Sequence, residues 1–312
     1  MPRSSKRHVN GRPAAAAGAP GVVDPVWLLK AFLAAVLVAV ACGYLTLCGL
    51  FYRGQWQLVL HPSRTAAAPE AVGGVPFQTV RFAAGATGVP QLTGWWIPAG
   101  QGAAFAHLTI LYLPGGDGSL AGDQGTLARL HDVGLSVFAL DYRGFGQSAE
   151  LHPSERSMAD DAEAAWDYLT RSRALGSDRI IPYGRGLGVA LALRLAATHA
   201  SVPALILDQP EFDVEGRVRR DSRSRLVPVG LLLRNRFALR PALDELKLPK
   251  LILSRGEVED PEVLRAADPK MTVVLPPSAM VRYAPVLKRF LDLYAPPTQV
   301  PAVMPRPAPR PQ

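Results

Sequence analysis

Short apolar runs alternate with segments of helical periodicity between residues 107 and 294. Continuous apolar runs of this length are typical of buried strands in a parallel sheet. Segments whose apolar residues recur every three or four positions are typical of the helices that connect such strands. Strands are expected at 107–113, 135–141, 179–183, 203–208, 249–253 and 272–275, and helices near 119–132, 156–173, 186–199 and 281–294. The alternation predicts an α/β fold with a doubly wound, mostly parallel sheet, whose ligand crevice lies beyond the carboxyl ends of the strands.

The longest stretch without a charge holds 22 residues, 31–52. As an α-helix that rises about 1.5 Å per residue it is about 33 Å long, which is enough to cross a bilayer. One transmembrane helix is therefore expected at 26–52, after a basic, low-complexity tail at 1–25. Five basic residues precede the stretch, whereas only Arg53 and Arg64 follow it before the next acidic residue. The positive-inside rule then predicts a single-pass membrane protein with a cytoplasmic N-terminus and its main domain on the opposite side.

Two other interpretations of this stretch stay open. A cleaved signal peptide normally has a shorter apolar core, and a shorter segment before it, than this chain has. Residues 39–42 faintly resemble a lipoprotein processing site at Cys42, but seven more largely apolar residues follow before Leu50. A buried helix of a soluble protein is seldom this long. The spanning helix is the first prediction, and processing near Cys42 is left undecided.

Composition limits the class of protein between these ends. Of the 312 residues 48% are hydrophobic and 19% charged, which suits one large domain, expected at 53–295, and excludes fibrous and disulfide-scaffold proteins. Seven prolines among the last 17 residues, 296–312, predict an extended, solvated Pro-rich tail that is disordered. The net charge of +8 is spread along the chain without the aromatic-plus-basic stripe of a nucleic-acid-binding protein. No nucleic-acid partner is therefore expected.

Glycine-rich loops follow three of the predicted strands. The loop at 114–119 has three glycines, which let the backbone approach a ligand closely and point amides at it. A second loop covers 141–148, and a third, GRGLG at 184–188, leads into an apolar helix. Small residues on both sides of a central position suit a tight elbow from strand to helix. The candidate crevice residues near these strand ends are Gly115, Asp117, Arg185 and His152.

The order of these segments resembles the α/β-hydrolase superfamily. The similarity rests on LTGWWIP (92–98), LPGGDGS (113–119), ALDYRGFGQS (139–148), GRGLG (184–188) and PKLILSRGEVED (249–260). The chain looks like the single-pass, membrane-anchored α/β-hydrolase-domain proteins related to serine aminopeptidases, and LVLHPS at 58–63 resembles their post-membrane segment. The resemblance runs from about Arg53 to Tyr294. It implies an α/β-hydrolase-like fold with a short cap insertion, here at about 211–245, and catalysis by a serine, an acid and a histidine in that order.

The catalytic triad that the resemblance implies is not intact. Its nucleophile position is Gly186, which has no side chain to attack an acyl carbon. Its acid position is Glu259, with Asp260 beside it. Its base position lies near Ser278, but no histidine follows His199 in this chain.

A backbone oxyanion hole can outlast a lost triad. By the resemblance its donors are the N–H groups of Gly116 and Leu187. A relocated dyad is the alternative source of catalysis, and it would pair His152 with Ser119, Ser148 or Ser254. The competing interpretation is that His152 only caps the helix that starts near Pro153.

Neither a metal nor a cofactor is expected. No pair of histidines or carboxylates has recognisable ligand spacing. Asp160 and Asp161 suit the first turn of a helix, where carboxylates interact favourably with the helix dipole. The five arginines between 217 and 225 are expected to pair with nearby acids, with anionic headgroups or an acidic partner as the alternative.

Two functions stay open on this evidence. The first is a pseudoenzyme: a non-catalytic, membrane-anchored protein of the hydrolase fold that binds a small acyl-type ligand or a protein partner. The second is an esterase- or peptidase-like hydrolase that works with residual or relocated catalytic residues. The loss of two triad positions together favours the first.

Overall fold

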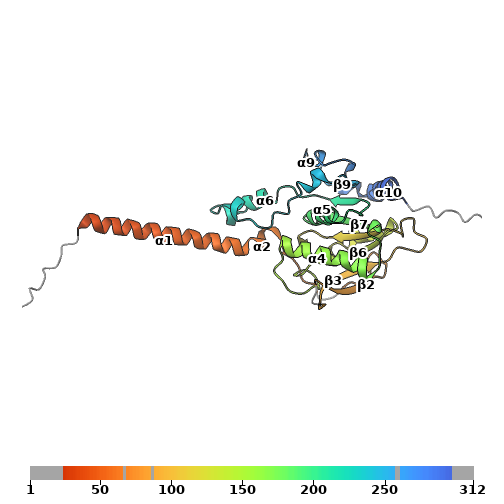
Figure 1. Cartoon of the computed structure of the whole chain (residues 1–312), viewed down its shortest axis with the longest axis horizontal. Helices are drawn as coiled ribbons and strands as arrows, with labels where there is room; N and C mark the ends of the chain where they lie inside the picture. The colour runs from red at the N-terminus through yellow and green to blue at the C-terminus, as the bar shows by residue number, and fades with distance from the viewer. Residues whose placement is uncertain (1–23, 66–67, 86–87, 257–260, 297–312) are drawn as a thin grey trace, which may run out of the picture. The chain divides into compact units, whose positions relative to one another are not determined.

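The computed structural model describes residues 24–65, 68–85, 88–256 and 261–296 (Figure 1). The chain divides into two compact units, Met1–Gly49 and Leu50–Gln312. Helix α1 (Pro25–Gly54) begins in the first unit, and none of its apolar window is buried. Within the described part of the chain it is the one helix long and apolar enough to cross a membrane, a criterion that a signal sequence also meets. The prediction of one long apolar helix near the N-terminus is confirmed.

In the second unit, eight strands of the described residues form one mostly parallel sheet, in the spatial order β10–β9–β8–β7–β4–β6–β3–β2. The strands from β10 to β6 run parallel, whereas β3 and β2 add antiparallel pairs at one edge. Every residue of β4 and β6 is buried, as expected for central parallel strands covered on both faces. The bounds are β2 (Gln78–Ala83), β3 (Pro90–Ile97), β4 (Thr109–Leu113), β6 (Ser136–Asp141), β7 (Ile180–Arg185), β8 (Leu205–Asp208), β9 (Lys250–Ser254) and β10 (Lys270–Val274).

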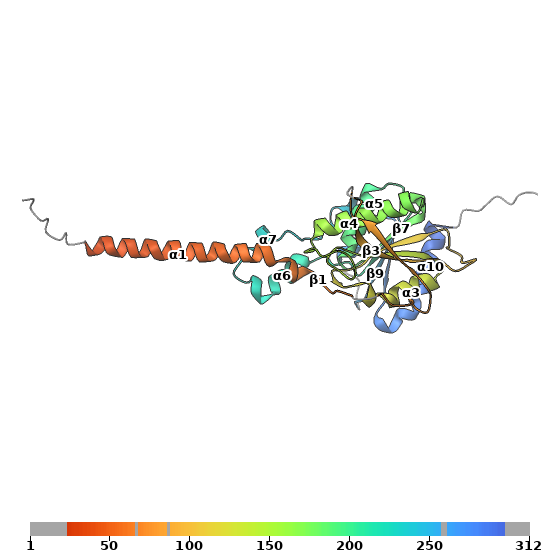
Figure 2. The ribbon, with the colours of Figure 1, turned by 90° about the horizontal axis from the view of Figure 1, so that it is seen from below.

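Helices cover both faces of this sheet (Figure 2). On one face α4 packs against α5, and on the other α3 packs against α10. These helices are α3 (Gln124–Asp132), α4 (Glu155–Asp167), α5 (Gly188–Thr198) and α10 (Tyr283–Tyr294). Three of them fall within the segments of predicted helical periodicity, and α4 begins one residue before its segment. The prediction of a doubly wound α/β fold is therefore confirmed.

Shorter elements complete the second unit. The segment expected to be a cap lies between β8 and β9 and contains α6 (Val214–Arg220), α7 (Val229–Leu232) and α8 (Ala242–Glu245). After α1 come α2 (Trp56–Val59) and β1 (His61–Pro62), and α9 (Pro261–Leu264) follows β9. Strand β1 pairs in parallel with β5 (Asp117–Gly118), so the chain just after α1 joins the loop that follows β4. The 3₁₀ helices span Leu120–Gly122, Ser177–Arg179, Ser222–Ser224 and Pro277–Arg282, and a π-helical turn, Tyr168–Ser172, extends α4.

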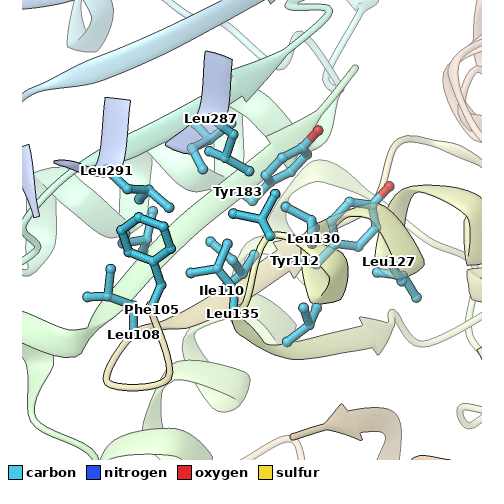
Figure 3. Packing of buried hydrophobic residues seen from close by; sticks show 14 of the residues in the cluster. Phe105, Leu108, Ile110, Tyr112, Leu127, Leu130, Leu135, Tyr183, Leu287 and Leu291 are labelled. Carbon is cyan, nitrogen blue, oxygen red and sulfur yellow. The ribbon is translucent and has the colours of Figure 1, made fainter. Parts of the chain in front are cut away.

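Apolar side chains fill the layer between the sheet and the pair α3 and α10 (Figure 3). Leu287 and Leu291 lie four residues apart on α10, and Leu127 and Leu130 lie three apart on α3, so each pair faces one side of its helix. All four, and Ile110 of β4, are at most 1% exposed. Full burial of one such side chain contributes about 1.5–3 kcal/mol. This packing fixes the strands, and with them the loops at their carboxyl ends.

Candidate functional site

The turn between β7 and α5 has the geometry of a strand-to-helix elbow. Gly186 stands at its centre with φ of +55°, in the left-handed region that favours glycine. A Cβ added to Gly184 would lie 2.5 Å from the carbonyl oxygen of Gly188, and one added to Gly188 would lie 2.6 Å from that of Pro114. The small residues on either side are therefore required by contact with backbone, as expected from the GRGLG spacing. A Cβ at Gly186 would meet nothing nearer than the Cα of Gly115, at 3.9 Å.

Apolar side chains pack against the Cα of Gly116, one of the two residues whose amides are expected to form an oxyanion hole. Neither the N–H of Gly116 nor that of Leu187 donates to an acceptor within the described ranges. A Cβ on Gly116 would come within 2.7 Å of both the Leu187 and the Leu60 side chains, which are almost fully buried. The carbonyl of Gly116 accepts the N–H of His61 at 2.7 Å. Leu60 and the pairing of β1 with β5 thus cover this loop, a role that the sequence did not reveal.

Arg185, the residue before the elbow glycine, is held by an ion pair with Asp123. Burial raises the pKa of the Asp123 carboxyl, and the charge of Arg185 opposes that rise. Beside this pair, burial raises the pKa of Tyr112 well above its ordinary value. Asp117 pairs with a different residue, because its exposed carboxylate contacts Nδ1 of His61 at 2.6 Å. The two charged crevice candidates are therefore not brought together.

A buried polar cluster stands at the end of β8. Asp208 accepts a hydrogen bond of 2.9 Å from the Tyr183 hydroxyl, which in turn accepts one of 3.2 Å from Tyr283. Arg255 lies 3.9 Å from the Asp208 carboxylate. Burial raises the pKa of both tyrosines, so they remain neutral donors. Sequence analysis missed this cluster, although a carboxylate at the end of a predicted strand was a signal for it.

The acid and base positions of the implied triad are only partly described. Glu259 and Asp260 lie outside the described residues. Ser278 is exposed in the 3₁₀ helix that follows β10. The chain's last histidine in sequence, His199, donates a hydrogen bond of 2.9 Å from Nε2 to the Glu163 carboxylate and stacks on Trp166, on the face of the sheet that carries α4 and α5.

The relocated dyad is not assembled. The hydroxyl of Ser148 donates to the carbonyl of Asp141 at 2.5 Å and accepts the N–H of Thr93 at 2.8 Å, so it is used inside the fold. Ser119 bonds the hydroxyl of Thr65. Among the described residues Ser254 makes no hydrogen bond to His152, whose ring instead packs at a tilt on Trp56 with ring centroids 5.1 Å apart. The expectation that His152 caps α4 was wrong. Ser154 caps that helix, in a capping box with Ser157.

The placement of Asp160 and Asp161 in a first helical turn was also wrong. Helix α4 begins at Glu155, which puts both residues beyond that turn. Asp161 is buried and accepts the backbone N–H of Arg143 at 2.8 Å and its Nε–H at 2.6 Å. Its carboxylate therefore fixes the loop at 141–148. The physical reason is that α4 packs on the sheet beside this loop. An acidic side chain that points inward from α4 therefore contacts the arginine of the loop.

The arginines of the cap segment are mostly paired, as expected. Arg217, Arg219, Arg220 and Arg223 form ion pairs with Glu211, Glu215, Asp213 and Asp221. Most of these pairs are exposed, where each contributes little to stability. Within the described part of the chain no group of three histidines, cysteines or carboxylates is placed to hold a metal ion.

Solved structures with this architecture are α/β hydrolases. An esterase of Pyrococcus furiosus matches with a TM-score of 0.57 at 17% identity and covers 76% of this chain and 97% of that one. An alpha-beta hydrolase of Vibrio vulnificus matches with a TM-score of 0.52 at 18% identity and covers 74% of this chain and 97% of that one. These likenesses show the α/β-hydrolase fold. Residues 107–296 match the family described as serine aminopeptidase, S33, and the chain belongs to that family.

Curated relatives share part of the sequence. An uncharacterized protein of Mycobacterium tuberculosis is 31% identical over 182 residues, which is 56% of this chain and 59% of that protein. The uncharacterized protein YfhR of Salmonella typhimurium is 30% identical over 130 residues, which is 38% of this chain and 44% of that protein. The chain thus matches less than two thirds of the length of these relatives.

Proposed function

We propose that this chain is a membrane-anchored, single-pass member of the α/β-hydrolase superfamily that does not catalyse hydrolysis and binds a small acyl-type ligand or a protein partner. The observation that carries the proposal is Gly186 at the centre of a well-formed elbow. The surrounding contacts keep the shape that presents a nucleophile, but a glycine presents no hydroxyl. Loss of a triad member costs about 10⁴ to 10⁶ in rate, which leaves too little turnover for a biological hydrolase.

The apolar packing around Gly116 supports the same proposal. An oxyanion hole stabilises charge only if the reacting oxygen reaches within about 3 Å of the N–H groups. Leu60 and Leu187 lie where a substituent on Gly116 would go, so apolar atoms fill the space at the Cα of this residue. This arrangement suits a scaffold retained for binding. Membrane anchoring through α1 is part of the proposal and rests on the length and apolar composition of that helix.

The test measures hydrolysis and nucleophile labelling with the full chain in a mild detergent. Wild type is compared with Gly186→Ser and with Gly186→Ser/Ser278→His, and Gly186→Ala is the matched control because it adds the Cβ without the hydroxyl. We expect no p-nitrophenyl butyrate turnover and no fluorophosphonate labelling of wild type or Gly186→Ala. Labelling should arise only where a serine is restored.

Turnover by the wild type would overturn the non-catalytic proposal, most directly if His152→Ala removed it. Binding is measured separately, as the thermal shift caused by non-hydrolysable acyl ethers of increasing chain length. A ligand present at about 100 times its Kd stabilises the folded chain by about 2.7 kcal/mol. If no acyl ether of any chain length shifts the melting temperature, the proposed binding function is left with a protein partner.

A further inference from the structure

A cationic groove lies at the end of α1, apart from the elbow. It has a volume of about 630 Å³ and belongs entirely to the second unit. Four arginines line it against two carboxylates, so its formal charge is 4 − 2 = +2 with histidine neutral. The arginines are Arg53, Arg156, Arg194 and Arg234, and the carboxylates are Glu155 and Asp160.

The wall of the groove is built by buried polar contacts. Gln55 is only 3% exposed, and its side-chain amide donates to the carbonyls of Tyr52 and Leu232, both at 3.0 Å. Its carbonyl oxygen accepts the N–H of Arg234 at 2.6 Å. The Arg234 guanidinium donates to the Tyr52 hydroxyl at 2.9 Å. Gln55 therefore joins the end of α1 to the cap segment and holds one arginine in place.

The positive charge of the groove is not cancelled by its own acids. Glu155 is already engaged, because one of its oxygens accepts the N–H groups of Arg236 and Phe237, both at 2.8 Å. Arg53, Arg156 and Arg194 have no ion-pair partner within the described ranges. Guanidinium groups recognise phosphate oxygens through paired hydrogen bonds, which makes several unpaired arginines around one hollow a phosphate-binding arrangement.

The position of the groove in the chain selects the source of the phosphate. Tyr52 is the last residue of the uncharged stretch, and Arg53 follows it directly. Tyrosine and tryptophan favour the membrane–water interface, and both Tyr52 and Trp56 line the groove. The chain's own tails do not complement it, since 1–23 and 297–312 carry basic residues and no acidic ones.

We infer that this groove binds the phosphate headgroup of an anionic phospholipid in the membrane that holds α1. The inference rests on the membrane anchoring included in the proposed function, and it is independent of the non-catalytic part. The headgroup phosphate lies among Arg53, Arg156 and Arg194, with the rings of Tyr52 and Trp56 at the level of the lipid glycerol. The headgroup then fixes the domain against the bilayer surface.

The test is native mass spectrometry of the full chain in detergent, titrated with phosphatidylglycerol or with phosphatidylcholine of the same acyl chains. We expect at least tenfold tighter binding of phosphatidylglycerol. Each charge near an anionic surface contributes about fivefold, so Arg156→Gln/Arg194→Gln should weaken phosphatidylglycerol binding about 30-fold. Arg156→Lys/Arg194→Lys keeps the charge and should retain most of the preference.

The matched control is Arg81→Gln/Arg289→Gln, which removes the same charge from two exposed arginines that do not line the groove. It should change binding less than twofold, and an equal loss in this control would overturn the inference. Equal binding of the two lipids would also overturn it. Groove-dependent binding of inorganic phosphate with no lipid preference would replace it by a soluble-phosphate site.

Alkaline carbonate extraction of the expressing membranes separates the two proposals. A chain released by the extraction refutes the anchoring and this inference together. A chain that stays in the membrane but shows no lipid preference refutes this inference alone.

Discussion

The elbow between β7 and α5 predicts that neighbouring glycines differ sharply in their tolerance of a side chain. An alanine at position 184 puts its Cβ 2.5 Å from both the Gly188 oxygen and the Val189 Cα, and one at 188 meets the carbonyls of Leu113 and Pro114. These are backbone atoms of β4, of the residue that follows it and of α5, and they cannot rotate away. Overpacking of this kind costs about 1–3 kcal/mol and sometimes more, so we expect Gly184→Ala and Gly188→Ala each to lose about 3 kcal/mol or more.

Position 186 should behave differently. Its Cβ has ordinary space, with the nearest atom 3.9 Å away, and the cost is the positive φ alone. A left-handed conformation costs a non-glycine residue about 1–2 kcal/mol. Gly186→Ala should therefore lose about 1–2 kcal/mol, clearly less than Gly188→Ala loses.

The measurement is the free energy of unfolding of each full-length variant, from urea titration in a fixed detergent with pulse proteolysis as the readout. In a unit of this size 1 kcal/mol corresponds to a change in Tm of about 2–4 °C, so the variants are separable by melting as well. Equal losses at 186 and 188 would show that position 186 is closed to a side chain. That result would refute the reasoning that the elbow still has the shape of a nucleophile site.

Two further predictions concern pH and topology. Burial raises the pKa of the Asp141 carboxyl from 3.8 to about 6. Between these values the folded chain holds a proton that the unfolded chain has lost, so this group should lower stability by up to about 3 kcal/mol as pH rises through the window. Burial raises the pKa of Asp161 to about 6 as well, so Asp141→Asn should reduce the slope in denaturant titrations from pH 4 to 7 without abolishing it, and an unchanged slope would contradict the assignment. In a Cys42→Ala/Cys48→Ala background, Ser172→Cys should react with a membrane-impermeant maleimide in intact cells. Ser4→Cys should react only after permeabilisation. The opposite pattern would reverse the predicted orientation.

Most of the fold could be predicted from the sequence because the signals that mark its strands and helices are local. Apolar runs mark the strands wherever both faces are buried, as in β4 and β6, and helical spacing marks α10. Gly184 was predictable for the same reason, since its clash with Gly188 and Val189 lies within the turn, whereas Gly188 meets Leu113 and Pro114 of a segment distant in sequence.

The parts of the site that were missed depend on distant pairings. Arg185 meets Asp123 across 62 positions, and His61 meets Asp117 across 56. No periodicity within one segment reports such contacts. Asp161 was misplaced because a pair of acids near the start of a helix suits its dipole, whereas the cap at Ser154 sets the true first turn earlier.

The pairing of β1 with β5 makes the connection from α1 to the domain a mechanical linkage. The N–H groups of His61 and Ser63 bond the carbonyls of Gly116 and Gly118 at 2.7 and 2.9 Å. Force carried along the chain from α1 reaches these two bonds before it reaches any strand of the large sheet. Tension on the anchor that overcomes the Gln55 bonds to the cap segment therefore loads the glycine loop beside the elbow before the large sheet, and it would draw Leu60, one residue before His61, away from Gly116.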